Sequence, residues 1–134
     1  MNWLTDTNVL SELVRPRPDS RVLEWAAGLD ERIVISAVTV EEITFGLSWK
    51  PKPRFQKTIE EFIAHSCEIL PVTETIARRA GAMRGRFRAR GIARTQSEAL
   101  IAATAYVQRL TLVTRNVRDF EGFGIELLNP FDEH

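Results

Sequence analysis

The sequence predicts an α/β fold in which helices cover both faces of a central parallel sheet of about five strands. Two observations predict it. Short apolar segments of strand length alternate with longer amphipathic segments along the 134 residues, and strands that are apolar throughout are typical of parallel sheets with both faces covered. The length suits one domain, expected to span residues 1–134.

Short apolar segments are expected to form the strands. They are Trp3–Thr5, Arg32–Ile35, Glu68–Leu70, Thr111–Thr114 and Ile125–Leu128. The first is followed directly by the acid Asp6, and Pro71 closes the third. Because they are short and apolar, we expect these strands to lie buried between the helices.

Segments with helical character connect these strands. They are Thr7–Val14, Ser20–Leu29, Thr39–Trp49, Phe55–Ser66, Thr73–Arg90 and Thr95–Arg109. The third helix and the last open on a capping-box pattern, Thr39-Val40-Glu41-Glu42 and Thr95-Gln96-Ser97-Glu98. Gly91 is expected to cap the carboxyl end of the long helix before it.

The composition excludes several classes of protein. With 44% hydrophobic and 27% charged residues, the chain is not a disordered or low-complexity protein. Cys67 is the single cysteine, which excludes an internal disulfide and a cysteine-based zinc site. No apolar run approaches the roughly 20 residues that span a bilayer, and the amino-terminal segment lacks the basic region of a signal peptide. We therefore expect a cytoplasmic location.

Charge is balanced over the whole chain, with 18 basic and 18 acidic residues, but not locally. Residues 71–98 contain a block of arginines and no lysine: Arg78, Arg79, Arg84, Arg86, Arg88, Arg90 and Arg94. Arginine suits bidentate contact with phosphate or carboxylate groups. Helical spacing places Arg84, Arg88 and Arg86 on one face or on adjacent faces, so these three are candidates to bind a nucleic acid. A solvated helix face, or a face that contacts a protein partner, remains an equal alternative.

Acidic residues follow the expected strands or begin the next helix. Asp6 follows the first strand, Glu41 and Glu42 the second and Asp119 the fourth, and Glu98 lies in the first turn of the last helix. In parallel sheets, ligands bind beyond the carboxyl ends of the strands. Converging carboxylates repel one another, and Mg²⁺, which prefers oxygen ligands and often acts on phosphates, relieves that repulsion. Two such ions can activate a water and stabilise the leaving oxygen of a phosphoryl displacement.

Each of these acids also has a purely structural interpretation. Glu42 and Glu98 occupy the position in a capping box where Glu bonds back to the cap residue. Asp119 is placed to cap a turn before Phe120, and Asp6 to cap the first helix. Both interpretations stay open for each residue at this point.

Four motifs, taken in order, resemble those of PIN-domain nucleases. They are Leu4-Thr5-Asp6-Thr7-Asn8-Val9-Leu10-Ser11-Glu12, Ser36 to Gly46, Glu98 to Ala105, and Thr114 to Phe120 with the tail Leu128-Asn129-Pro130-Phe131. In the second motif a Glu lies four residues before Gly46, which selects Glu42. The nearest resemblance is to the VapC and FitB group, toxin ribonucleases of bacterial type II toxin–antitoxin pairs, and it covers essentially the whole chain.

The resemblance implies a PIN fold, an α/β/α sandwich, and a Mg²⁺- or Mn²⁺-dependent endoribonuclease. It implies that Asp6, Glu42, Glu98 and Asp119 form an acidic metal site, with Asp6 and Glu98 as the expected direct ligands, and that Thr7, Asn8, Thr114 and Asn116 orient ligands or water. It further implies a homodimer, a VapB-like antitoxin that blocks the site in a larger assembly, and contact with operator DNA only through that antitoxin.

The chain departs from the family pattern at Glu98, where the third motif usually has Asp. Because Glu is one methylene longer, the alternative is a catalytically weak PIN-fold module that acts in a DNA-binding toxin–antitoxin complex. A phosphoacceptor receiver domain is disfavoured because the third strand does not end in an acid. A dinucleotide-binding domain is excluded because no Gly-rich turn follows the first strand.

Overall fold

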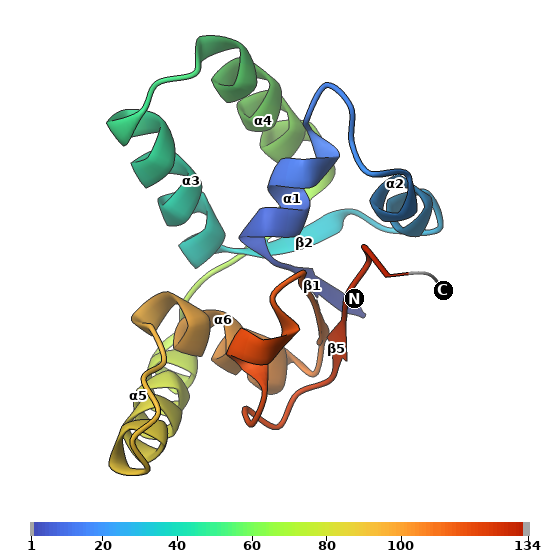
Figure 1. Cartoon of the computed structure of the whole chain (residues 1–134). Helices are drawn as coiled ribbons and strands as arrows, with labels where there is room; N and C mark the ends of the chain where they lie inside the picture. The colour runs from blue at the N-terminus through green and yellow to red at the C-terminus, as the bar shows by residue number, and fades with distance from the viewer. Residues whose placement is uncertain (1, 133–134) are drawn as a thin grey trace.

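The computed structural model describes residues 2–132 as a parallel sheet between two layers of helices. The strands are β1 (Trp3–Thr5), β2 (Ile33–Ser36), β3 (Cys67–Leu70), β4 (Thr111–Val113) and β5 (Leu127–Leu128). They pair in parallel as β1-β4-β5 and as β2-β3, and β2 lies beside β1, so the order across the molecule is β3-β2-β1-β4-β5 (Figure 1). The predicted α/β fold with a parallel sheet is confirmed.

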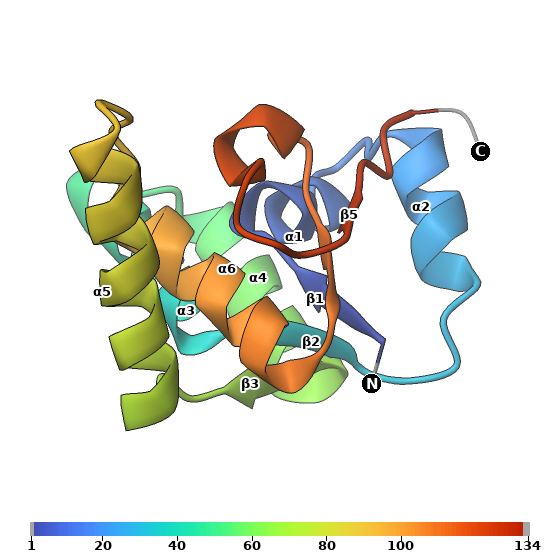
Figure 2. The ribbon, with the colours of Figure 1, turned by 90° about the horizontal axis from the view of Figure 1, so that it is seen from below.

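The helices follow the predicted order with small shifts at their ends. They are α1 (Thr7–Leu13), α2 (Ser20–Ala27), α3 (Ala37–Trp49), α4 (Pro53–Ser66), α5 (Glu74–Ala89) and α6 (Gln96–Gln108). The short 3₁₀ helix η1 (Val117–Phe120) was not predicted. Figures 1 and 2 show α1, α3 and α4 on one side of the sheet and α5 and α6 on the other. None of the helices within residues 2–132 is both long enough and apolar enough to cross a membrane.

Three hydrophobic clusters fill the spaces between the sheet and the helices, and the smallest of them includes Val22 of α2. Because successive strand residues face opposite sides of a sheet, Leu4 and Val34 pack toward α5 and α6. Ile33 and Ile35 pack toward α1, α3 and α4. Strands buried on both faces explain why the sequence shows continuous apolar segments rather than alternating ones.

The predicted start of α3 at Thr39 is wrong. The helix begins at Ala37, and the Ser36 Oγ accepts a hydrogen bond of 3.0 Å from the Val38 N–H. Ser36 is as good an N-cap as Thr39 and comes directly at the end of β2, so the chain turns into the helix there. Thr39 and Glu42 therefore form no capping box.

The two other predicted helix caps are confirmed. Thr95 and Glu98 form the capping box of α6, with both of its hydrogen bonds present. Gly91 follows the end of α5 with a φ of +79°, and the Ile92 N–H donates to the Phe87 carbonyl at 2.9 Å. Such a turn satisfies the last carbonyls of a helix and favours glycine.

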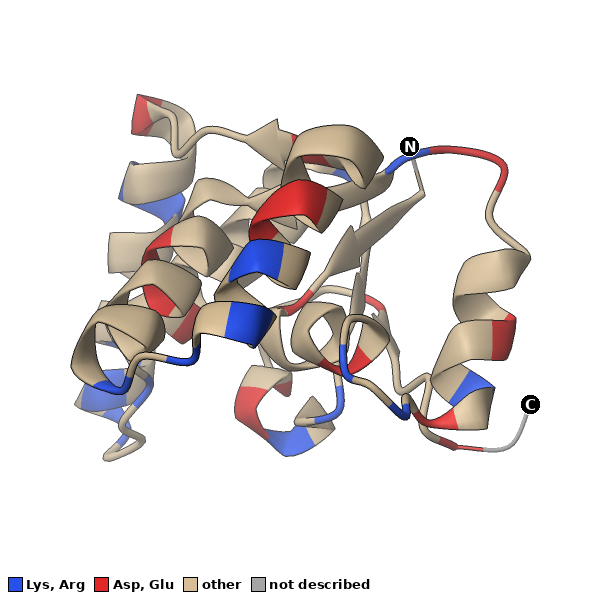
Figure 3. Cartoon of the chain, turned by 90° about the horizontal axis from the view of Figure 1, so that it is seen from above, with Lys and Arg blue, Asp and Glu red and all other residues tan. Residues whose placement is uncertain are grey.

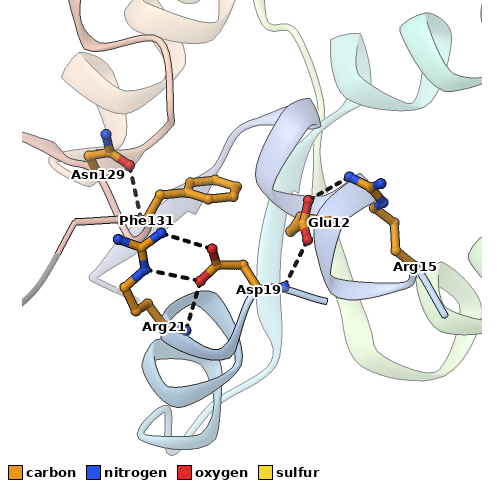
Figure 4. Close-up of polar contacts among 6 residues, drawn as sticks. All are labelled: Glu12, Arg15, Asp19, Arg21, Asn129 and Phe131. Atoms are coloured by element: carbon orange, nitrogen blue, oxygen red, sulfur yellow. Dashed lines mark hydrogen bonds and ion pairs between the residues drawn. The ribbon is translucent and has the colours of Figure 1, made fainter. Parts of the chain in front are cut away.

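Glu12 fixes α2 against α1. This carboxylate is only 8% exposed and accepts hydrogen bonds from Arg15 Nη1 at 3.1 Å and from the Asp19 N–H at 2.8 Å (Figure 4). Asp19 in turn caps α2 by accepting from the Arg21 N–H at 2.8 Å. Glu12, the second acid of the first motif, thus has a structural role in joining α1 to α2.

Candidate metal site

Asp6 is buried at the turn between β1 and α1. Its side chain is 5% exposed and accepts three hydrogen bonds. Oδ1 accepts from the Thr7 N–H at 2.8 Å, and Oδ2 accepts from Asn8 Nδ2 at 2.9 Å and from Thr114 Oγ1 at 2.7 Å. Asp6 is therefore the N-cap of α1, as one interpretation predicted, and at the same time a buried carboxyl at the end of a strand.

The charge of Asp6 is not balanced by a cation of the chain. Within residues 2–132, no Lys or Arg forms an ion pair with Asp6, Glu42 or Glu98. Burial raises the pKa of Asp6, the three hydrogen bonds lower it, and the charge of Glu98 raises it further. Because a carboxylate offers about four acceptor positions, the three hydrogen bonds leave one acceptor position of Asp6 unused.

Glu42 reaches the same region from α3. Its Oε1 accepts a hydrogen bond of 2.7 Å from Thr7 Oγ1, which also lies 3.0 Å from Thr39 Oγ1. A hydroxyl has one proton, so Thr7 gives its proton to the carboxylate and accepts from the fully buried Thr39. Burial raises the pKa of Glu42 above its ordinary value, and the charges of Asp6, Glu41 and Glu98 act in the same direction.

Glu98 forms the capping box that one of the two interpretations predicted. Its Oε1 accepts from the Thr95 N–H at 2.8 Å, and its own N–H donates to Thr95 Oγ1 at 3.1 Å. Its charge also raises the pKa of both Asp6 and Glu42. The cap uses one carboxylate oxygen, which leaves Oε2 for a second ligand.

Asp119 is joined to this group only through the backbone. It lies on η1, half-buried, and its N–H donates to the Asn116 carbonyl at 3.0 Å. The Asn116 N–H donates in turn to Thr114 Oγ1 at 3.0 Å. The charge of Glu98 thus raises the pKa values of Asp6 and Glu42, and the charge of Asp6 also raises that of Glu42. Among the described residues, Asp119 is connected to these acids only through hydrogen bonds that backbone N–H groups donate.

The predicted orienting residues divide in the same way. Thr7, Asn8 and Thr114 contact the acids through their side chains, whereas Asn116 is exposed and contributes its backbone N–H. The sequence pattern did not reveal Thr39 as a support for Thr7, because it assigned Thr39 to a helix cap. The sequence feature that could have indicated this role is the spacing of three residues between Thr39 and Glu42, which places both on the same side of the helix.

The carboxyl groups fit a hard divalent cation. Among the described residues, no three Asp, Glu, His or Cys side chains stand in an arrangement that would by itself enclose a metal ion. Mg²⁺, however, is commonly held by one or two carboxylates and several waters. Buried oxygen ligands without a cationic partner match that coordination chemistry.

The candidate RNA-binding arginines do not all share one surface. Arg84 and Arg88 line a hollow of about 320 Å³ together with Arg94. Arg86 is exposed, and its Nη1 lies 3.6 Å from the Met83 Sδ. The structure therefore groups Arg84 with Arg88 and separates Arg86 from them.

Known proteins resemble this chain over nearly its full length. Residues 4–124 match the family model of the PIN domain. The chain is 32% identical over 134 residues to VapC ribonuclease Y4jK of Sinorhizobium fredii, a match that covers 95% of this chain and 96% of that protein. It is 33% identical over 137 residues to toxin FitB of Neisseria gonorrhoeae, which covers 97% of this chain and 99% of that protein.

A solved structure shows the same likeness in three dimensions. DNA-bound VapBC from Salmonella typhimurium superposes with a TM-score of 0.86 at 26% identity, covering 97% of this chain and 98% of that chain. Together with the family match and the sequence relatives, this similarity extends across the sheet and both helical layers. The chain belongs to the PIN-domain family, in the group that contains VapC ribonuclease Y4jK and toxin FitB.

Proposed function

We propose that the protein is a Mg²⁺- or Mn²⁺-dependent endoribonuclease and the toxin of a VapBC-type toxin–antitoxin pair. The observation that carries the proposal is the buried Asp6 beside Glu42 and Glu98, with no cationic partner among the described residues. The ribonuclease relative supports RNA as the substrate.

Asp6 and Glu98 would hold the cation, with Glu42 and Asp119 completing the acidic site. A divalent cation, when bound, lowers the pKa of a water and neutralises charge on a phosphodiester. Asn8 and Thr114 hold the Asp6 carboxylate in one orientation through hydrogen bonds of 2.9 and 2.7 Å.

Thr7 does the same for Glu42, which would accept a proton from an attacking water. Its pKa, raised by burial, favours this role, because a base with a raised pKa binds a proton more strongly.

Arginines of α5 would hold the RNA. Arg84 and Arg88 line the same hollow, and guanidinium groups donate two hydrogen bonds to a phosphate group. Arg86, on another part of the helix surface, would contact a neighbouring part of the strand.

The proposed partners are a second copy of the chain and a VapB-like antitoxin. The solved VapBC structure is DNA-bound, which supports an assembly of this kind that contacts operator DNA through its antitoxin. A cytoplasmic location is proposed with it, since the substrate RNA and the operator DNA are found there.

The experiment is cleavage of an end-labelled RNA pool by the purified protein with Mg²⁺ and with EDTA. Cleavage that requires the metal, and that Asp6→Asn abolishes, supports the proposal. Cleavage that is equal in EDTA contradicts the metal site. Absence of cleavage by a folded, metal-loaded protein favours the alternative of a catalytically weak binding module.

A further inference from the structure

A second hollow lies at the opposite end of α6 from the acidic site. Its volume is about 740 Å³, and Arg79, Tyr106, Arg109, Thr111 and Glu126 are among the residues that line it. It opens where β4 begins, whereas the acids lie where the strands end. Glu98 of the acidic site and Tyr106 of the hollow are eight residues apart on α6, which corresponds to about 12 Å along the helix axis.

Arg79 is held in this hollow without an acceptor. Its guanidinium carbon lies 3.2 Å from the centre of the Tyr106 ring, which fixes the group by stacking. Its Nε is buried and has no hydrogen-bond partner in the part of the chain that the structure describes. Because Glu74 pairs with Arg78 instead, the charge of Arg79 has no carboxylate partner among those same residues. A buried donor without an acceptor is costly, and an anion in the hollow would pair with the charge of the guanidinium group.

Arg109 lines the same hollow in an unusual backbone conformation. It caps the carboxyl end of α6 with φ 58° and ψ 47°, and among residues 2–132 it is the one non-glycine residue with a positive φ. Glycine is the residue that this position favours. A cation at a helix carboxyl end is favourable, but a basic residue inside the last turn would give that benefit without the unfavourable φ.

The remaining charges make the hollow basic. Glu126 lies 3.3 Å from the Thr111 hydroxyl and forms an ion pair with neither arginine of the hollow. Arg79, Arg86 and Arg90 follow one another at spacings of seven and four residues, which places them along one side of α5. Basic positions recur along this helix, at the left of Figure 3. They lead from the hollow toward the turn before α6.

We propose that this hollow is an exosite that binds a phosphate group of a single-stranded RNA, outside the acidic site. Arg79 and Arg109 donate to the phosphate oxygens, and the outer face of the Arg79 guanidinium is the platform for a base. The identity of the ligand as RNA rests on the proposed function. The basic side of α5 then guides the strand between the exosite and the rest of the protein.

The test measures binding of a fluorescent single-stranded RNA to the full chain carrying Asp6→Asn, in EDTA, across a series of salt concentrations. Arg79→Gln and Arg109→Gly each remove one cation from the hollow. We expect several-fold weaker binding at low salt and a salt slope smaller by about 0.7 for each phosphate that the variant no longer binds. Arg109→Gly should keep or raise the melting temperature, because glycine adopts a positive φ without cost.

Arg78→Gln is the matched control, since Arg78 is on the same helix and pairs with Glu74 rather than lining the hollow. It should leave affinity and salt slope unchanged. Unchanged binding by both hollow variants overturns the exosite, and so does an equal reduction in Arg78→Gln, which would show an effect of net charge only.

Inorganic phosphate, added as a competitor, distinguishes a site for the free anion. Phosphate that binds in the hollow should raise the melting temperature of wild type more than that of the hollow variants. If it does so while RNA binds all of these proteins with the same affinity, the exosite for RNA is overturned. Because binding is measured without metal, failure of the proposed nuclease activity would appear separately, as absence of cleavage by the wild-type chain in Mg²⁺.

Discussion

Thr7 Oγ1 lies 2.7 Å from Glu42 Oε1 and so joins the turn after β1 to α3, 35 residues away in sequence. The preceding residue, Asp6, carries the buried carboxyl of the site, whereas Glu42 is half-buried. The adjacent residues Asp6 and Thr7 therefore position two acids. One is Asp6 itself, at the end of β1, and the other is Glu42, on the helix that follows β2. This arrangement makes the Asp6–Thr7 turn the centre of the candidate metal site.

Thr7→Val should destabilise the protein by about 1–3 kcal/mol. Valine has nearly the shape of threonine but lacks the hydroxyl that hydrogen-bonds Thr39 and Glu42. Thr7→Ser keeps the hydroxyl and should cost much less. Denaturant unfolding of the three proteins measures the difference. If the Val variant were as stable as wild type, the hydrogen bond between Thr7 and Glu42 would not support the site.

Asp6→Asn should abolish metal-dependent RNA cleavage and leave the fold intact. Asparagine caps a helix as well as aspartate does, and removal of a buried charge offsets the acceptor that Asn8 and Thr114 lose. Without metal, the melting temperature should stay the same or rise. Cleavage of labelled RNA and thermal unfolding, each with and without Mg²⁺, test both parts; full cleavage by this variant would remove Asp6 from the site.

Stability of the metal-free protein should depend on pH through Asp6. Its folded-state pKa is raised, chiefly by burial, so the folded protein binds this proton more tightly than the unfolded chain. The stabilisation is present below the ordinary carboxyl pKa and is lost as pH rises through the raised value. Glu42 acts with the same sign.

The measurement compares wild type with Asp6→Asn by denaturant unfolding between about pH 5 and 8. The advantage of Asp6→Asn should be largest at the high end and shrink as pH falls. Mg²⁺ should reduce that advantage at neutral pH, because the cation stabilises the ionised carboxyl. An advantage that is constant with pH would show that Asp6 ionises normally.

Arg84→Ala and Arg88→Ala should each weaken RNA binding and reduce the salt slope by about 0.7, since both side chains line one hollow. Arg86→Ala, at a separate place on α5, serves as the comparison and should reduce affinity less. Titration of RNA into the Asp6→Asn protein across salt gives all three values. Equal values in wild type and the Arg84 and Arg88 variants would assign this face to a protein partner.

Local patterns predicted most of the fold because local chemistry determines it. Apolar runs indicated the strands, and the Thr95–Glu98 box and Gly91 formed as predicted. The predicted start of α3 was wrong because Ser36 and Thr39 are both acceptable caps, and the choice between them depends on where β2 ends.

The candidate site was predictable only in part. Asp6, Glu42 and Glu98 were selected from their places after strands and in a first turn, and in the structure the charge of Glu98 raises the pKa of both Asp6 and Glu42. The hydrogen bond from Thr7 to Glu42 and the support from Thr39 depend on packing between distant segments, which spacing along one helix does not show. The same holds for Asp119, whose place at the border of the group follows from the turn that forms η1.

Glu98 offers the most direct test of the central claim, that these acids bind a catalytic metal. Glutamine serves in a capping box as well as glutamate does, so Glu98→Gln should stay folded, at a cost of about 0.3–1 kcal/mol from the helix dipole. If Glu98 is a ligand, the variant loses the charge that holds the cation. Glu98→Asp keeps the negative charge and should retain or raise cleavage.

The measurement is isothermal titration of Mn²⁺ into wild type, Glu98→Gln and Glu98→Asp, with RNA cleavage by the same preparations. We predict that wild type and Glu98→Asp bind Mn²⁺ and cleave RNA, and that Glu98→Gln does neither while unfolding at nearly the same temperature. Unchanged Mn²⁺ affinity and turnover in Glu98→Gln would show that Glu98 only caps α6, and would contradict the site as proposed.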